Sequence, residues 1–189
     1  IPVAGFSVDT NAGCYPVTVN YTNLSDPNGL GNMSDMKFLW DFGNGKTDTV
    51  IHPSNIVYVD ARTQDSIYVI TLSAYSSNGC PAEAYDTITV YPKPTVAFDY
   101  SSPDGCGPLT VSLQNKSQPN NNGSINLMSF VWTLGNDENS TNVHPNTTFQ
   151  SSLVKDSIYT TKLVGVSEHP CTDSIEKAIQ ISPKPRSKF

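Results

Sequence analysis

The chain contains two copies of one sequence module, and this internal repeat limits the folds that it can adopt. Phe38–Asn44 aligns with Phe130–Asn136 at a shift of 92 positions (132 − 40 = 92). After the second copy loses one residue, a shift of 91 (156 − 65 = 91) aligns Asp65–Tyr68 with Asp156–Tyr159. At roughly 100 to 200 residues per domain, a chain of 189 residues fits one large domain or two small ones, and the repeat favours two.

The junction between the copies suggests where each module begins. Tyr91–Pro94 is short and proline-rich, which is typical of a semi-rigid, extended spacer. Similar openings occur three times, at Ile1–Phe6, Lys93–Phe98 and Lys184–Phe189. We therefore expect a first module over residues 1–92, a second over 93–183, and the start of a third repeat at 184–189, as in a fragment of a longer array.

Alternation of side-chain character predicts short β-strands in each module. Tyr68, Ile70, Leu72 and Ala74 recur at every second position, which is typical of a half-buried strand. Clusters of Asn, Gly and Pro, such as residues 43–46, separate such runs. About seven strands in a module of this length indicate an all-β fold, an antiparallel β-sandwich. With the extended spacer, we expect the pair of modules to be elongated.

Four aromatic residues are candidates for the centres of the two cores: Phe38 and Trp40 in the first copy, and Phe130 and Trp132 in the second. Tryptophan can also form an exposed platform on which sugars stack. Because both copies place the tryptophan in an alternating apolar pattern, core packing is the favoured interpretation.

Charge and hydropathy exclude several classes of partner. The chain has 17 acidic and 11 basic residues, for a formal net charge of −6, so it has no excess of cations for nucleic acid or an anionic membrane surface. Its apolar stretches fall far short of the ~20 residues that a membrane-spanning helix needs. We therefore expect neither nucleic acid binding nor membrane insertion.

Several motifs resemble those of the PKD (polycystic-kidney-disease) domain family. The family's Trp-Asp-Phe-Gly-Asp-Gly stretch is matched by Trp40–Gly45, and its opening by Pro94–Phe98. A further pattern of Pro, Val, Asn-x-Ser is matched by Pro16, Val19 and Asn23 in the first copy and again in the second. The resemblance covers almost the whole chain, twice, and implies two tandem immunoglobulin-like β-sandwiches.

The cysteine positions resemble those in PKD repeats of large surface proteins from gliding, Bacteroidetes-type bacteria. Such proteins are exported by the type IX route and include giant adhesins, so the resemblance implies an extracellular or cell-surface location, associated with the outer membrane through the full-length protein. The second copy departs from the family motif at Thr133 and Leu134, where the first has Asp41 and Phe42.

The four cysteines indicate disulfide bonds rather than a metal site. Cys14 and Cys80 in the first copy correspond to Cys106 and Cys171 in the second, and none has another cysteine two to four residues away. Disulfides belong to oxidising compartments. Pairing within modules would join Cys14 to Cys80 and Cys106 to Cys171. Pairing within modules is the favoured interpretation. In a sandwich with alternating strand directions, however, Cys14 and Cys80 lie a strand length apart, and the same geometry brings Cys14 close to Cys171. Both pairings remain open at this point.

Catalytic and metal-binding patterns are weak. His52 and His144 occupy equivalent loop positions, which favours a structural role, and no nucleophile or second ligand accompanies them in a recognised motif. We therefore expect no enzyme activity and no cofactor. Calcium is the least weak metal option, with oxygen ligands from Asp9, Asp26, Asp35, Asp41 and Asp48, although their spacing matches no EF-hand.

Five Asp-Ser/Thr-apolar sequences resemble the O-glycosylation signal of Bacteroidetes-type secreted proteins. The acceptors would be Thr49, Ser66, Thr87, Ser157 and Ser174. The alternative interpretation is that an acid and a hydroxyl residue simply begin a strand.

These observations favour a non-enzymatic structural and adhesion module, part of the repeat stalk of a large secreted or cell-surface protein, such as an adhesin of gliding motility. Its partners would be neighbouring repeats and a surface polysaccharide or protein. The alternative is an accessory module of a secreted hydrolase that holds polysaccharide or protein on exposed Tyr58, Tyr75 and Tyr85.

Overall fold

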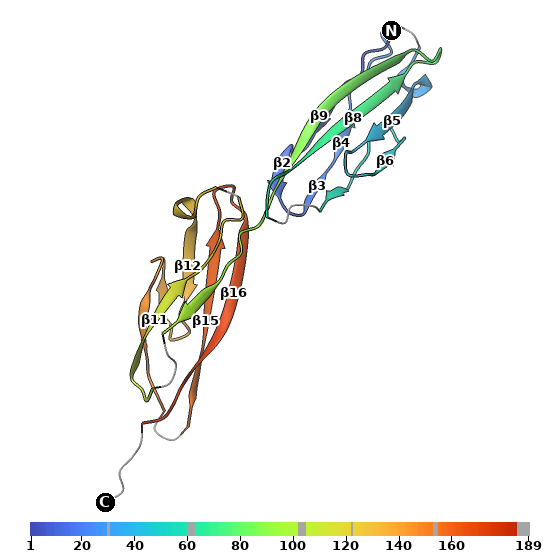
Figure 1. Cartoon of the computed structure of the whole chain (residues 1–189). Helices are drawn as coiled ribbons and strands as arrows, with labels where there is room; N and C mark the ends of the chain where they lie inside the picture. The colour runs from blue at the N-terminus through green and yellow to red at the C-terminus, as the bar shows by residue number, and fades with distance from the viewer. Residues whose placement is uncertain (30, 60–62, 102–104, 122, 153–154, 185–189) are drawn as a thin grey trace, which may run out of the picture. The chain divides into compact units, whose positions relative to one another are not determined.

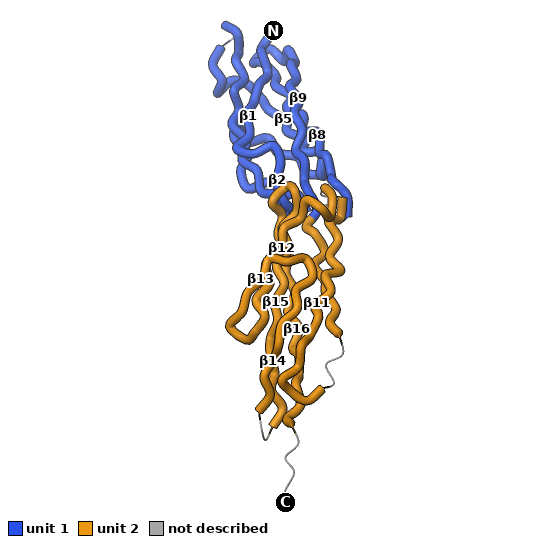
Figure 2. The backbone as a smooth tube through the Cα atoms, turned by 90° about the vertical axis from the view of Figure 1, so that its left-hand side faces the viewer, with its two compact units in different colours: residues 1–92 blue, residues 93–189 orange. Residues whose placement is uncertain are grey.

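The computed structural model is all-β and divides into two compact units, residues 1–92 and 93–189 (Figure 2). It describes every residue except 30, 60–62, 102–104, 122, 153–154 and 185–189. The expected start of a third repeat therefore lies, apart from Lys184, outside the described residues. Among the residues that are described, no helix is long and apolar enough to span a bilayer.

Unit 1 consists of two β-layers (Figure 1). In one layer β1 (Phe6–Val8) pairs with β4 (Tyr21–Asn23), and β3 (Val17–Val19) pairs with β7 (Ile56–Tyr58). Only Asn20 separates β3 from β4, so the two ladders continue one another. The other layer has the order β2-β9-β8-β5-β6, and its members are β2 (Ala12–Cys14), β9 (Pro81–Tyr91), β8 (Ser66–Tyr75), β5 (Lys37–Asp41) and β6 (Thr47–Asp48). β2 lies parallel to β9, and the other pairs are antiparallel.

Unit 2 repeats this arrangement. One sheet has the order β10-β11-β14, formed by Phe98–Tyr100, Leu109–Asn115 and Asn146–Phe149. The other has the order β13-β12-β15-β16, formed by Asn139–Ser140, Ser129–Thr133, Ser157–Val166 and Thr172–Ile181. A 3-10 turn precedes the tryptophan strand in each unit, η1 (Met33–Asp35) and η2 (Ile125–Leu127). The predicted all-β, immunoglobulin-like sandwich is confirmed.

Each core is centred on a tryptophan from the strand that the alternation predicts. Trp40 and Trp132 are fully buried, and Phe38 and Phe130 lie beside them in the core. Each indole N–H donates to a backbone carbonyl: Trp40 Nε1 to Val50 O at 3.0 Å, and Trp132 Nε1 to Asn142 O at 2.9 Å. These buried, satisfied side chains are packing residues and do not form a platform for sugar.

A glycine directly after each tryptophan strand allows the turn to approach the neighbouring strand closely. Gly43 has φ +68°, and a Cβ built on it would lie 2.5 Å from Val69 O in β8. Gly135 is placed in the same way against Thr160 O, also at 2.5 Å. Gly45, two residues further along the first turn, has φ +79° but no atom within 4 Å of a built Cβ.

We predict that Gly43→Ala destabilises unit 1 by about 3 kcal/mol or more, because it adds a backbone clash to the cost of a positive φ. Gly45→Ala is the matched control, since it has the same strained φ without the clash, and we expect it to cost only about 1 kcal/mol. Urea-dependent hydrogen exchange of peptides from β5 and β8 measures both. If both variants destabilised unit 1 equally, the close approach of Gly43 to β8 would not contribute to the cost of the substitution.

Unit 1 also buries a pair of tyrosines that unit 2 lacks. The hydroxyls of Tyr21 and Tyr58 are hydrogen-bonded to each other, and both side chains lie in the core. The corresponding residues of unit 2 are Leu113 and Phe149. Burial raises the pKa of Tyr58 to about 12, and it raises the pKa of Tyr21 as well. Because ionisation is suppressed only in the folded state, stability is full below the ordinary pKa of 10 and falls as the pH rises towards 12.

The double variant Tyr21→Leu/Tyr58→Phe, which copies unit 2, should therefore be less sensitive to alkali. We expect the wild type to lose about 2 kcal/mol more than the variant between pH 9 and pH 11.5. Urea titrations at the two pH values measure this difference. An equal loss in both proteins would contradict the assignment.

Candidate functional site

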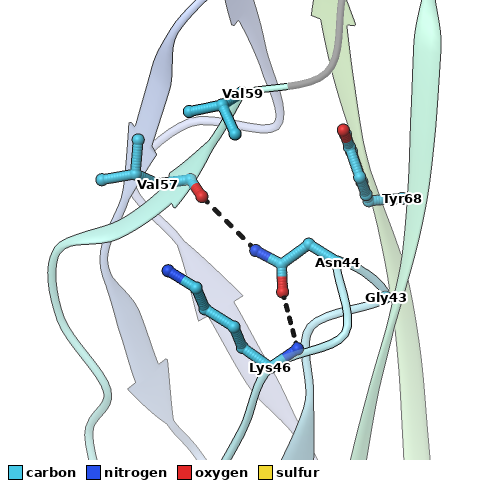
Figure 3. Close-up of a pocket in the computed structure, with 6 residues that line it drawn as sticks. All are labelled: Gly43, Asn44, Lys46, Val57, Val59 and Tyr68. Atoms are coloured by element: carbon cyan, nitrogen blue, oxygen red, sulfur yellow. Dashed lines mark hydrogen bonds between the residues drawn. The ribbon is translucent and has the colours of Figure 1, made fainter.

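A pocket of about 350 Å³ lies beside the turn that follows β5 in unit 1 (Figure 3). Gly43, Asn44, Lys46, Val57, Val59 and Tyr68 line it. The turn is closed by a backbone bond from Phe42 N to Lys46 O (3.1 Å), and Asn44 Oδ1 accepts from Lys46 N (3.1 Å). The asparagine side chain is thereby fixed between the turn and the strand that carries Val57.

The opposite walls of the pocket come from both sheets. Val57 is in β7, and its carbonyl accepts a long hydrogen bond from Asn44 Nδ2 at 3.4 Å. Tyr68 is in β8, and its ring packs against that of Tyr58 with centroids 4.7 Å apart. Figure 3 shows Asn44 between Val57 and Tyr68. The pocket therefore combines a cation, an amide, a phenol and an apolar wall.

The position in unit 2 that corresponds to this pocket, beside the turn that follows β12, is occupied by a carboxylate of the protein itself. Glu138 stands where unit 1 has Lys46, and its Oε2 accepts from Thr147 Oγ1 (2.7 Å) and from Asn136 Nδ2 (3.0 Å). These two hydrogen bonds hold the pKa of Glu138 below its ordinary value. Tyr159, which corresponds to Tyr68, donates its hydroxyl to Gln150 O at 2.8 Å.

Sequence reasoning identified residues 43–46 only as a turn and did not find this pocket. Asn44, Val57 and Tyr68 belong to separate elements, and no motif marks them. The available signal was the divergence between the copies, because Lys46 and Ile56 replace Glu138 and Thr147 at otherwise similar positions.

The structure places Cys14 and Cys80 at opposite ends of β9, so pairing within a module is wrong. Cys14 is opposite Tyr91, the last residue of β9, whereas Cys80 directly precedes the first residue of that strand. Eleven residues at about 3.3 Å each separate them by roughly 36 Å, far beyond the ~7 Å between Cα atoms that a disulfide spans. In unit 2, Cys106 forms an isolated β-bridge with Ser182, the residue after β16, whereas Cys171 directly precedes that strand. The two cysteines of unit 2 are therefore also a strand length apart.

Cys14 and Cys171 are instead the cysteines that are disulfide-bonded. Cys80 and Cys106 carry free thiols, so the expectation that all four cysteines are disulfide-bonded is also wrong.

The five aspartates considered for calcium are engaged in local hydrogen bonds. Each accepts from a nearby backbone N–H: Asp9 from Asn20 (3.0 Å), Asp26 from Asn28 (2.6 Å), Asp35 from Asn32 (3.0 Å), Asp41 from Gly43 (2.9 Å) and Asp48 from Val50 (3.1 Å). The backbone and side-chain N–H groups of Asn20 lower the pKa of Asp9. Within the described part of the chain, no three His, Cys, Asp or Glu side chains gather as a metal site. Calcium binding stays a prediction that this geometry does not favour.

The other predicted site residues are spread over both units. Ser66 and Ser157 begin β8 and β15, as expected for residues that simply start a strand, whereas Thr87 and Ser174 lie within β9 and β16 and Thr49 follows β6. Glycosylation of these residues stays a prediction.

The two equivalent histidines make the same structural contact. His52 Nδ1 accepts from Asn23 N, and His144 Nδ1 accepts from Asn115 N, both at 3.1 Å. Each histidine therefore holds its loop against the last residue of a strand, β4 in unit 1 and β11 in unit 2.

Only part of the predicted tyrosine surface is exposed. Tyr85 is 63% exposed and Tyr75 is 36% exposed, but Tyr58 is fully buried and hydrogen-bonded in the core. The prediction that Tyr58 is available to a ligand is wrong.

Comparison with known proteins supports no family assignment by sequence: no family model and no curated protein matches. Among solved structures, the chain is similar to the PKD1 domain of Vibrio anguillarum Epp, with 22% identity over 49% of this chain and 96% of that one, at a TM-score of 0.39. It is similar to the PKD1 domain of the Vibrio cholerae metalloprotease PrtV, with 22% identity over 48% and 98%, at 0.39. Clostridium thermocellum CbhA fibronectin(III)-like modules share 13% identity over 95% and 94%, also at 0.39. The fold assignment therefore rests on the strand topology described above.

Proposed function

We propose that this chain is a non-enzymatic, load-bearing segment of a secreted or cell-surface protein built from repeated sandwich modules. Cys14 and Cys171 are disulfide-bonded, whereas Cys80 and Cys106 are free, so we infer that Cys14 and Cys171 are bonded to each other, and this bond carries the proposal. Disulfides form and persist in oxidising compartments, so this bond supports a location outside the cytoplasm. The same bond also supports a mechanical role.

The proposed bond would close a covalent loop around residues 15–170. Tension applied at the two ends of the chain passes from Cys14 to Cys171 through the bond. Most strands of both sandwiches, β3 through β15, lie within the loop and are not in the direct line of force. Extension on unfolding is limited to the residues outside the loop, and the segment keeps its length under load.

The wider context of the proposal rests on the sequence. The repeated module and its resemblance to PKD domains support an array of such units in a large adhesin, exported by the type IX route and active in adhesion or gliding. In that setting the partners are neighbouring repeats and a surface polysaccharide or protein.

Stretching single molecules from their two termini tests the load-bearing role. With the disulfide intact, we expect no release of residues 15–170; after reduction, roughly 550 Å of additional chain should be released, at about 3.5 Å per residue. Cys14→Ser should behave as the reduced protein without reductant, whereas Cys80→Ser, which removes a free thiol, should behave as the wild type. A non-reducing peptide map of the same sample should contain the Cys14–Cys171 peptide. Full extension of the unreduced wild type would refute the proposal.

A second candidate is an accessory module that holds polysaccharide, and the exposed ring of Tyr85 on β9 favours it. Aromatic side chains offer a large contact area to sugars at low entropic cost. Glycan-array binding by the wild type that falls about tenfold in Tyr85→Ala, but not in Tyr15→Ala, would support this role. Absence of binding, or equal binding by all three proteins, would exclude it for this residue.

A further inference from the structure

The pocket of unit 1 presents hydrogen-bond donors that the described protein leaves unpaired. The ammonium of Lys46 makes no ion pair with any residue that the structure describes. The hydroxyl of Tyr68 has no hydrogen-bond partner within that same part of the chain. Among the described residues, the side-chain nitrogen of Asn44 donates only to Val57 O, over a long 3.4 Å. An acceptor placed in the pocket would therefore meet three available donors.

Unit 2 shows which acceptor this corner of the fold accommodates. There the turn has the same geometry as in unit 1. Asn136 Nδ2 lies 3.0 Å from Glu138 Oε2, and Thr147 Oγ1 donates to the same oxygen from 2.7 Å. The tyrosine hydroxyl is also used, because Tyr159 donates to Gln150 O. A carboxylate from the chain itself fills the corner and satisfies its donors.

Unit 1 keeps the asparagine and the tyrosine but replaces the acid with a cation. Lys46 takes the place of Glu138, Ile56 takes the place of Thr147, and Val59 takes the place of Gln150. The internal carboxylate is lost, and the cation that replaces it attracts one from outside. A charge-assisted hydrogen bond from an ammonium to a carboxylate is about twice as strong as one between neutral groups.

From these contacts we infer that the pocket beside the Gly43–Lys46 turn binds a hexuronic acid residue, the acidic sugar of an anionic polysaccharide. Its carboxylate would take the position that Glu138 occupies in unit 2, between Asn44 and Lys46. Its ring would lie against the apolar wall of Val57 and Val59, and Tyr68 would donate to a ring hydroxyl.

The size and lining of the pocket favour a sugar over an acidic side chain. A volume of about 350 Å³ lies at the lower end of the range of about 300 to 1,000 Å³ for small-molecule sites, so it suits a single compact unit. An aspartate or glutamate side chain would satisfy the donors but leave the valine wall uncovered. A uronate joins the carboxylate directly to a ring with an apolar face.

This inference goes beyond the load-bearing role and is tested separately from it. D-glucuronate is titrated into the complete, oxidised chain at low salt, with the side-chain amide of Asn44 and the backbone amides of Gly43 and Lys46 followed by NMR. We expect saturable shifts at these groups with D-glucuronate. D-glucose, which lacks the carboxylate, and L-glutamate, which lacks the ring, should each bind on the order of tenfold more weakly.

Variants distinguish binding in the pocket from a non-specific effect of the protein's net charge. Lys46→Glu, which installs the charge of unit 2, should abolish the shifts, and Tyr68→Phe should weaken binding several-fold. Lys37→Glu makes the same change of net charge at an exposed position of β5 outside the pocket and should bind as the wild type does. The inference is overturned if D-glucuronate gives no saturable shifts, if glucose or glutamate binds equally well, or if Lys37→Glu weakens binding as much as Lys46→Glu. A failure here leaves the stretching result unaffected, so the two proposals can fail independently.

Discussion

A buried indole N–H has to find an acceptor, and this requirement organises each sandwich. Trp40 and Trp132 fill the centres of their cores, and each reaches a carbonyl ten residues further along the chain, in the segment after the edge strand. Each bond thereby ties that segment to the side chain at the centre of the core. Both units use the same bond, although the residues that supply the carbonyls, Val50 and Asn142, differ. The carbonyl is a backbone group, so its side chain is free to vary.

The long final strand of each unit keeps the two cysteines of that unit too far apart to form a disulfide with each other. In unit 1, the parallel pairing of β2 with the end of β9 places Cys14 at that end, while the β8–β9 hairpin holds Cys80 at the other. Two residues of one module that look like natural partners in the sequence are thus separated by the length of a strand. The proposed bond from Cys14 to Cys171 would enclose most of the chain in one covalent loop, and this is the physical basis of the proposed mechanical role.

The two units differ in charge at one position of the turn that follows the tryptophan strand. The turn after the tryptophan strand keeps its glycine and asparagine in both copies, since Gly43 and Gly135 approach a neighbouring strand too closely for any side chain. The residue two positions after the asparagine is free to change. In unit 2 it is Glu138, whose carboxylate accepts hydrogen bonds from Asn136 and Thr147. In unit 1 it is Lys46, which lines a pocket and forms no ion pair with any described residue.

The sequence by itself determined the all-β class. Period-two alternation around Trp40 and along Tyr68–Ala74 indicates which side chains of a strand face the core, and this pattern does not depend on what packs on the other side of that core. It failed at Tyr58, since Ile56–Val59 is apolar throughout and shows no alternation from which a buried face could be identified. The disulfide and the pocket were decided only by tertiary structure. Bond formation by Cys14 depends on which end of β9 it occupies, and the pocket depends on Asn44, Val57 and Tyr68 converging from three separate elements. Local spacing carries no record of such long-range distances.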